Sequence, residues 1–214
     1  MSLSICSVGA ANGEDISICF EWEKEGARQR ERFVISAAQF ASLGLSCGDC
    51  PRETYDSVAY AARVHAALRK GLLMLGYGAC SSGRLRRKLI AKGIHPEIAA
   101  EAVDILLADG YLCDGDNAQR EAEKGVAKGW GKRRILSSLY DKGYSDGAVR
   151  SAMLSLEDAE IDFVSMCAEQ MARRLSALPE TPEERQKLFA AMARLGYSTS
   201  EIKEAYGLFV KQLR

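Results

Sequence analysis

The chain has 214 residues, of which 47% are hydrophobic, with 29 Lys plus Arg and 29 Asp plus Glu. This composition is typical of a globular protein and excludes an intrinsically disordered chain. The formal net charge of zero excludes a bulk basic field for nucleic acid, so a site for a polyanion must be a local patch. No apolar stretch is long enough to span a bilayer and the first residues do not resemble a secretory signal, so we predict a cytoplasmic protein without a membrane partner.

Residues 1–54 differ from the rest of the chain because they carry a strand pattern. Apolar and polar residues alternate over Ile16–Trp22, which is the period of a half-buried strand. Residues 24–28 contain a glycine and predict a turn, and Gln29–Ile35 then predicts a returning strand. A lone hairpin is only marginally stable, so we expect this segment to be an accessory element.

A short helix and a linker should follow the hairpin. Ser36 is a good N-cap for a helix over Ala37–Leu43, and Gly44–Arg52 has the composition of a linker. The linker contains Cys47 and Cys50 as a single C-x-x-C, whereas a structural zinc site needs four ligands. Both histidines of the chain stand alone in the sequence, so we predict no metal or other cofactor. A zinc or thiol-redox protein centred on this cysteine pair remains an alternative.

Helical signals dominate from Tyr55 onward, and they contain an internal repeat. Gly93, Gly143 and Gly196 each follow a helical pattern directly, where a left-handed C-cap favours glycine, and they recur roughly 50 residues apart. Positions eight before, four before, one after and nine after the glycines are apolar or small in every copy: Leu85, Leu89, Ile94 and Ala102; Ile135, Leu139, Tyr144 and Ala152; Leu188, Met192, Tyr197 and Ala205. Each copy is therefore a helix, a tight turn and a second helix.

A further helical stretch precedes each of these pairs: Tyr60–Tyr77, Asp116–Lys128 and Asp162–Ser176. One such three-helix unit cannot bury its apolar face alone, so neighbouring units should stack. The predicted fold is mainly α, with three tandem three-helix repeats stacked into an elongated curved array behind the β-hairpin and helix. Capping boxes at Thr181 and Ser198 place two helix starts in the last repeat. The predicted divisions are an accessory segment and three repeats: 1–54, 55–109, 110–157 and 158–214.

Three blocks of sequence now carry a family resemblance. The block over 110–118, GYLCDGDNA, resembles the acidic linker between the first two repeats of the RecX family. The run over 128–139, KGWGKRRILSSL, and the run over 82–89, SGRLRRKL, are similar to that family's second and first repeats. Each is followed by Lys-Gly and an apolar residue, and the resemblance covers roughly residues 60 to 214. Departures at Arg84, Cys113 and Gly115 put in doubt an exact role for the linker but leave the repeat intact.

Basic residues gather on the helices of the first two repeats. The third repeat is more balanced, since Glu183 and Glu184 offset Lys187 and Arg194. A solvated outer face is the alternative for any one cation, and Trp130 is either an exposed binding residue or a plug of the helix junction. We predict a partner-binding surface made of these residues: Arg84, Arg86, Arg87, Lys88, Lys92, Lys128, Trp130, Lys132, Arg133, Arg134 and Lys142.

The sequence contains no phosphate-binding G-x-x-x-x-G-K-[ST] loop, H-E-x-x-H or G-x-S-x-G motif, so we predict no enzyme and no small-molecule substrate. The resemblance implies a non-enzymatic regulator that binds RecA and RecA–DNA filaments and inhibits recombinase and coprotease activity, thereby modulating DNA repair and the SOS response. DNA phosphates would be a further partner, bound weakly when alone. A helical-repeat transcriptional regulator acting directly on DNA is the alternative function, and binding to DNA without RecA would favour it.

Overall fold

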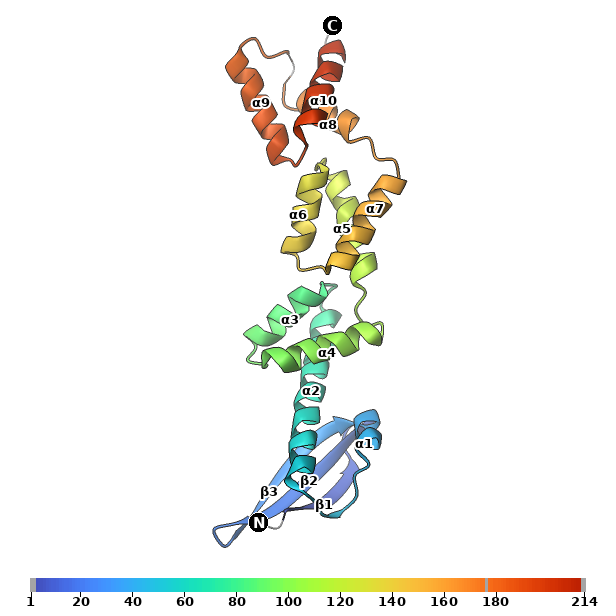
Figure 1. The fold of residues 1–214 in the computed structure, drawn as a ribbon, viewed down its shortest axis with the longest axis vertical. Coiled ribbons are helices and arrows are strands. Elements are labelled where there is room, and N and C mark those ends of the chain that lie inside the picture. The colour runs from blue at the N-terminus through green and yellow to red at the C-terminus, as the bar shows by residue number, and fades with distance from the viewer. Residues whose placement is uncertain (1–2, 176, 213–214) are drawn as a thin grey trace. The chain divides into compact units, whose positions relative to one another are not determined.

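The computed structural model describes residues 3–175 and 177–212 (Figure 1). It is mainly helical with a small antiparallel sheet before the helices, which confirms the predicted fold class. The strands are β1 (Leu3–Ala10), β2 (Asp15–Lys24), β3 (Ala27–Ser36) and β4 (Gly48–Asp49). The helices are α1 (Ala37–Leu43), α2 (Arg52–Gly76), α3 (Ser82–Ala91), α4 (Pro96–Ala108), α5 (Asp114–Ala127), α6 (Lys132–Asp141), α7 (Asp146–Asp158), α8 (Phe163–Ala172), α9 (Pro182–Arg194) and α10 (Thr199–Gln212). None of the helices in the described residues has both the length and the apolar character that a membrane span requires.

Contacts divide the chain into two compact units. Unit 1 runs to Gly78 and includes Leu85–Tyr111, whereas unit 2 consists of Ala79–Arg84 and the chain from Leu112 onward. The first three residues of α3 thus belong to unit 2 and the remainder to unit 1. The finer division of the chain at residues 54, 109 and 157 stays a prediction.

The sheet of unit 1 has four antiparallel strands in the order β3-β2-β1-β4. β2 and β3 form the hairpin that the alternating residues predict, with Ile18 paired to Phe33. β1 and β4 add two strands that the sequence did not predict. In β1 a bulge between Ile5 and Ser7 shifts the register, and this interrupts the alternation by which a strand is recognised.

Helix α2 connects the two hydrophobic clusters of unit 1. Its first part lies on the sheet, where Val58 is fully buried and the ring of Tyr55 meets that of Phe20 edge-on at 5.1 Å. Its second part packs on α4, with Ala67 and Ala102 buried together. Figure 1 shows these two ends of α2, one on the sheet and one beside α4. The helix begins before the predicted stretch because its first turns are held by the sheet.

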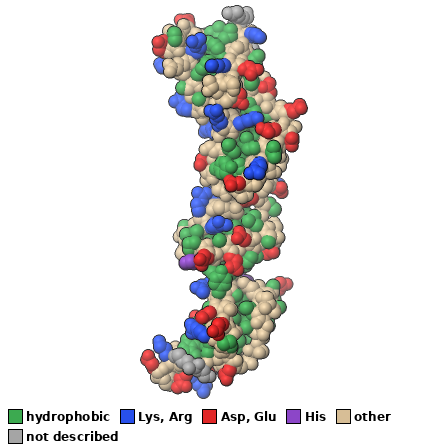
Figure 2. Space-filling view, viewed as in Figure 1, with side chains coloured by type: hydrophobic (Ala, Val, Ile, Leu, Met, Phe, Trp, Pro, Cys, Tyr) green, Lys and Arg blue, Asp and Glu red, His purple; other side chains and the backbone are tan. Residues whose placement is uncertain are grey.

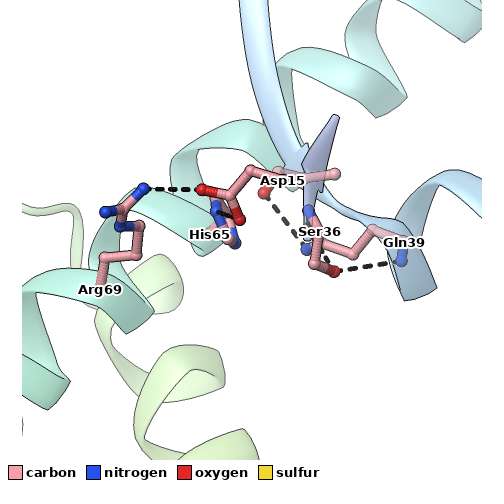
Figure 3. A network of polar contacts seen from close by, with 6 residues as sticks. Asp15, Ser36, Gln39, His65 and Arg69 are labelled. Atoms are coloured by element: carbon pink, nitrogen blue, oxygen red, sulfur yellow. Dashed lines mark hydrogen bonds and ion pairs between the residues drawn. The ribbon is translucent and has the colours of Figure 1, made fainter. Parts of the chain in front are cut away.

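A polar network fixes the sheet against α2 (Figure 3). Asp15, at the start of β2, accepts a 2.6 Å hydrogen bond from Arg69 Nη1 on α2. The buried His65, one turn earlier on α2, has Nε2 3.0 Å from Asp15 Oδ1, an ion-pair contact rather than a hydrogen bond of ordinary geometry. Beside it, Ser36 and Gln39 form a capping box at the start of α1, as predicted for this cap. This network joins the strands to the helix through charge as well as apolar packing.

The structure has the internal repeat that the glycine spacing predicts. Gly93, Gly143 and Gly196 have φ values of 83°, 81° and 95°, in the left-handed region that glycine adopts without strain. The apolar positions four and eight residues before them are no more than 5% exposed: Leu85, Leu89, Ile135, Leu139, Leu188 and Met192. The three short helices that end at these glycines are thus equivalent elements with equivalent buried faces.

The last repeat has the helix starts that its sequence predicts. Glu184 N donates to the Thr181 hydroxyl at 3.2 Å, and Ser198 N donates to Glu201 at 2.6 Å, so both capping boxes form. The helical stretch predicted to end at Ser176 corresponds to α8, which ends sooner, and Ser176 itself lies outside the described residues. Fully buried side chains from α8, α9, α10 and the turn between α9 and α10 complete the core of unit 2: Met171, Met192, Phe209 and Tyr197.

Candidate interaction surface

The predicted basic residues fall into both units. Four of them are in unit 1: Arg86, Arg87 and Lys88 on α3, and Lys92 just beyond its end. Arg86 Nη2 lies 3.6 Å from the carboxylate of Asp104 on α4, and both side chains are well exposed. In unit 2 the structure places the rest: Arg84, Lys128, Trp130, Lys132, Arg133, Arg134 and Lys142. The group in unit 2 contains Trp130, the aromatic residue of the predicted set.

Trp130 lies at the entrance to α6 with cations against its ring. The guanidinium of Arg134 stands 4.4 Å from the ring centroid and the ammonium of Lys128 5.1 Å from it. Both distances suit cation–π attraction. The indole is half-buried and packs against the core of unit 2, where it lies next to Gly125. Trp130 therefore fills the helix junction with one part of its surface and presents a cation-lined part outward.

A shallow groove of about 500 Å³ opens beside Trp130. One wall is α6, which contributes Arg133, Arg134 and Asp141, and the other is the end of α9 with Arg194. Three guanidinium groups and one carboxylate thus line a hollow whose aromatic wall is Trp130. Figure 2 shows Lys and Arg side chains gathered where the α9 part of unit 2 meets the α6 part. We call this hollow the arginine groove.

Two of these arginines differ from Lys132 and Lys142 of the predicted surface. Within residues 3–175 and 177–212, Arg133 and Arg194 have no acidic partner. Lys132 pairs with Glu157 at 3.3 Å, and Lys142 pairs with Glu121. Hydrogen bonds to lysines, of which Lys142 is the second largest contributor after Lys124, hold the pKa of Glu121 below its usual value. Lys132 and Lys142 are therefore engaged within the protein, whereas Arg133 and Arg194 in the arginine groove are available for a ligand.

Backbone hydrogen bonds between two repeats hold the walls of the groove together. Gly131 N donates to Leu195 O at 2.8 Å, and Arg133 N donates to Gly196 O at 3.1 Å. The first amides of α6 thus satisfy carbonyls at the end of α9, which would otherwise lack partners. A Cβ on Gly131 would lie 2.4 Å from the carbonyl carbon of Gly196, so glycine is required for this approach. We call this contact the glycine joint.

A buried tyrosine supports the glycine joint from behind. Tyr197 is 1% exposed, and its hydroxyl donates to Gly129 O at 2.9 Å. Burial raises the pKa of Tyr197 far above its ordinary value, so the hydroxyl stays protonated and remains a donor. Gly129 has a φ of 70°, and a Cβ there would meet the amide of Gln170 at 2.3 Å. The turn before α6 is therefore fixed on two sides.

An equivalent joint occurs at the other end of α6. Gly83 N donates to Gly143 O at 3.1 Å, and a Cβ on Gly83 would lie 2.6 Å from that oxygen. The buried Asp114 completes it by accepting from Ser82 N at 2.8 Å and from Ser82 Oγ at 2.6 Å. The carboxylate thereby caps the start of α3 from the next repeat. Residues of the acidic linker, whose role the sequence left in doubt, therefore have a structural role here.

A hollow between α6 and α7 was not foreseen from the sequence. Leu136, Tyr140 and Leu154 are 38%, 48% and 52% exposed, and they line this hollow together with charged residues: Asp146, Arg150 and Glu157. Leu136 and Leu154 stand at the positions where the preceding repeat has Arg86 and Asp104, which form an ion pair. A comparison of repeats at exposed positions would have revealed this difference. Clustered exposed apolar side chains mark contact surfaces for proteins.

The cysteines of the linker belong to unit 1. Cys47 is exposed and Cys50 is half-buried, with its thiol 3.7 Å from Leu3 O. In the part of the chain that the structure describes, no three His, Cys, Asp or Glu side chains gather as the ligands of a metal ion would.

Comparison with known proteins gives a consistent set of relatives. No family model matches the chain. A protein named regulatory protein RecX from Xanthomonas campestris pv. campestris is 30% identical over 126 residues, which are 58% of this chain and 76% of that protein. The protein of the same name from Chromohalobacter salexigens is 26% identical over 125 residues, which are 58% of this chain and 80% of that protein.

Two solved structures have the same fold. A crystal structure of a regulatory protein RecX matches with a TM-score of 0.70 at 17% identity, over 99% of this chain and 100% of that one. RecX from Lactobacillus salivarius matches with a TM-score of 0.57 at 18% identity, over 70% of this chain and 97% of that one. At these identities the structures establish the likeness of fold, and the sequence relatives carry the likeness of family.

Proposed function

Since the chain belongs to the RecX family of regulatory proteins, we propose that it binds the RecA recombinase on DNA and restrains it. On this proposal it acts without catalysis of its own, by occupying a surface of the RecA–DNA filament. The expected consequences are lower strand exchange and lower coprotease activity, and hence control of DNA repair and of the SOS response.

The observation that carries this proposal is the arginine groove beside Trp130. Arg133 and Arg194 have no acidic partner of their own among the described residues, and Arg134 is oriented by the indole. Guanidinium groups bind carboxylates and phosphates through paired hydrogen bonds, and Trp and Arg dominate the energetics of many protein interfaces. A groove of this composition suits acidic side chains of a protein or phosphates of the DNA that the protein coats.

The exposed apolar side chains in the hollow between α6 and α7 favour a protein as the principal partner. Nucleic acid presents a charged backbone, and it does not reward exposed residues such as Leu136 and Leu154. The zero net charge of the chain also disfavours tight binding to free DNA, because affinity for duplex DNA rises with the number of phosphates neutralised. DNA contacts would therefore add to a protein interface and would weaken as salt rises.

A charge-reversal experiment tests the proposal. A variant with Arg133→Glu, Arg134→Glu and Arg194→Glu should lose inhibition of RecA strand exchange and ATPase activity, since attraction becomes repulsion at the groove. Surface changes of this kind usually alter stability by roughly 0.5 kcal/mol or less each, so the circular dichroism spectrum should be retained.

The matched control reverses three cations of the last repeat that do not line the groove: Arg185→Glu, Lys187→Glu and Lys203→Glu. This variant has the same change in net charge and should inhibit RecA nearly as well as the parent. Arg194 cannot serve as a control, although its helix is nearly neutral in sequence, because it lines the groove. Equal inhibition by both variants would refute a role for the groove. A footprint on one defined DNA sequence without RecA would instead favour a transcriptional regulator.

A further inference from the structure

Two cysteines meet across neighbouring strands in unit 1. The register of β1 and β2 pairs Ile5 with Phe20 and Ser7 with Cys19, and Cys6 occupies the bulge between these pairs. A bulge places two residues of one strand opposite a single residue of the other, so Cys6 and Ser7 both face Cys19. Cys6 is exposed and Cys19 is half-buried, whereas their neighbours Ile5 and Phe20 point into the core. Both thiols therefore lie on the face of the sheet opposite the core.

The Cys6 thiol contacts the backbone of Cys19. Cys6 Sγ lies 3.3 Å from the carbonyl oxygen of Cys19, within hydrogen-bond distance for sulfur. The pKa of Cys19 is raised, first by burial and then by a hydrogen bond between the two thiols. Cβ atoms of directly opposed residues in an antiparallel pair are about 4.5–5.5 Å apart, close to the separation that a disulfide requires. Because Ser7 and not Cys6 is the register partner of Cys19, the bulge must shift for the two sulfur atoms to reach bonding distance.

Two arginines lie near Cys19. Cys19 is paired in register with Arg32 on β3, and Arg30 lies two residues earlier on the same strand, where it is ion-paired with Glu21 at 2.6 Å. Both guanidinium groups act to lower the pKa of Cys19 and thus partly offset the larger effect of burial, which raises it. The exposed Cys6 is the thiol that a dissolved oxidant reaches first.

We propose that Cys6 and Cys19 are a reversible dithiol–disulfide pair, oxidised by a peroxide-class oxidant. The Cys6 thiol releases its proton, and the thiolate attacks one oxygen of hydrogen peroxide. The O–O bond breaks, the departing hydroxide takes up a proton, and the products are a sulfenic acid on Cys6 and one water. The Cys19 thiol then releases its proton and its thiolate attacks the Cys6 sulfur. The S–O bond breaks, and the departing hydroxide takes up a proton and leaves as a second water while the S–S bond forms. Two thiols lose two electrons in total and one peroxide gains them.

The bond would link β1 to β2 at the point where their ladder is irregular. Ile5, beside the bulge, is 2% exposed in the cluster between the sheet and α2, so fixing β1 also fixes that core. A disulfide built across a bulge is a strained one, and strained disulfides are more readily reduced than structural ones. The pair is therefore suited to reversible oxidation in a compartment that normally keeps thiols reduced.

Two other thiols near β1 are the competitors that an experiment must distinguish. β4 pairs with β1 from its other edge, with Gly48 opposite Ile5, so Cys47 lies close in register to Cys6. Cys50 lies beside Leu3, at the start of β1.

The full-length protein, reduced and then freed of reductant, is treated with hydrogen peroxide, alkylated, digested without reduction and analysed by mass spectrometry. The expected product is a peptide pair joined at Cys6 and Cys19, lighter by about 2 Da than the two reduced peptides together and separated again by dithiothreitol. A Cys47→Ser, Cys50→Ser variant should form the same bond at the same peroxide dose. In Cys6→Ser, Cys19 should stay fully open to alkylation. A bond from Cys6 to Cys47, or a Cys6 sulfinic acid beside an alkylated Cys19, would overturn the proposal.

Discussion

Replacing Gly131 by alanine perturbs the glycine joint directly. The added Cβ would lie 2.4 Å from the carbonyl carbon of Gly196 and 2.5 Å from Tyr197 N. Both are backbone atoms of a turn fixed at Gly196 by its left-handed conformation, so they cannot rotate away as a side chain would. The start of α6 must therefore move away from the end of α9.

The cost follows from the contacts that are lost. Two hydrogen bonds across the joint, from Gly131 N to Leu195 O and from Arg133 N to Gly196 O, contribute a net of about 1 kcal/mol each. Residual steric strain at a tightly packed site adds about 1–3 kcal/mol. The smaller conformational freedom of alanine in the unfolded chain offsets this by about 0.4–1 kcal/mol. We expect the free energy of unfolding to fall by about 2–4 kcal/mol.

Urea unfolding followed by far-UV circular dichroism measures this change. Gly147→Ala is the matched control, because Gly147 lies in the first turn of α7 and a Cβ there meets nothing within 4 Å. It should leave stability unchanged or raise it by up to about 1 kcal/mol, since alanine is the better helix former. The fluorescence of Trp130, recorded in a Trp22→Phe background, should change only in Gly131→Ala. An unfolding midpoint for Gly131→Ala equal to that of the parent would refute the close approach at the joint.

Three further predictions concern other fixed points of the structure. Asp114→Ala removes the acceptor for two donors at the start of α3 and should lower the free energy of unfolding by about 1–3 kcal/mol in urea titrations, whereas an unchanged midpoint would show that water replaces it. Asp15→Ala removes the carboxylate that holds a buried histidine and an arginine of α2, and should accelerate amide exchange in β2; exchange at the parental rate would contradict this. Lys124 and Lys142 hold the pKa of Glu121 below its usual 4.5, so its stabilising effect is complete above that pH and is lost as the pH falls through the lowered pKa. Glu121→Gln should therefore reduce the loss of stability between pH 5 and acid, measured by thermal unfolding, relative to the parent.

The repeat could be predicted because its determinants are local. A glycine in the left-handed region ends each short helix, and buried residues at fixed offsets face the core, so Gly93, Gly143 and Gly196 identify three equivalent units from sequence alone. β1 could not be predicted because the bulge at Cys6 interrupts its alternation. The early start of α2 at Arg52 depends on the sheet beneath it, which is tertiary context rather than local propensity.

The candidate site was predictable in composition but not in arrangement. Arg133, Arg134 and Trp130 were recognised from their clustering, and they lie together in the groove. Arg194 was missed because only the pairing of α6 with the end of α9 brings it to them, and acidic residues at the start of α9 concealed it in the sequence. Asp114 was missed because it caps a helix whose start lies more than thirty residues earlier in the chain.

On the proposed function, charge pairing within the protein separates Lys132 and Lys142 from the arginines of the groove. Lys142 and Lys132 already bind Glu121 and Glu157, so a ligand that takes either lysine must replace an existing partner and gains little. Arg133 and Arg194 require no such exchange. Arg133 lies on the α6 side of the glycine joint, and Arg194 lies on the side formed by the end of α9. The spacing between these two guanidinium groups is thus set by backbone contacts and not by their own side chains. Loss of the joint and loss of the arginines should consequently have the same effect on the partner, although only the first lowers stability.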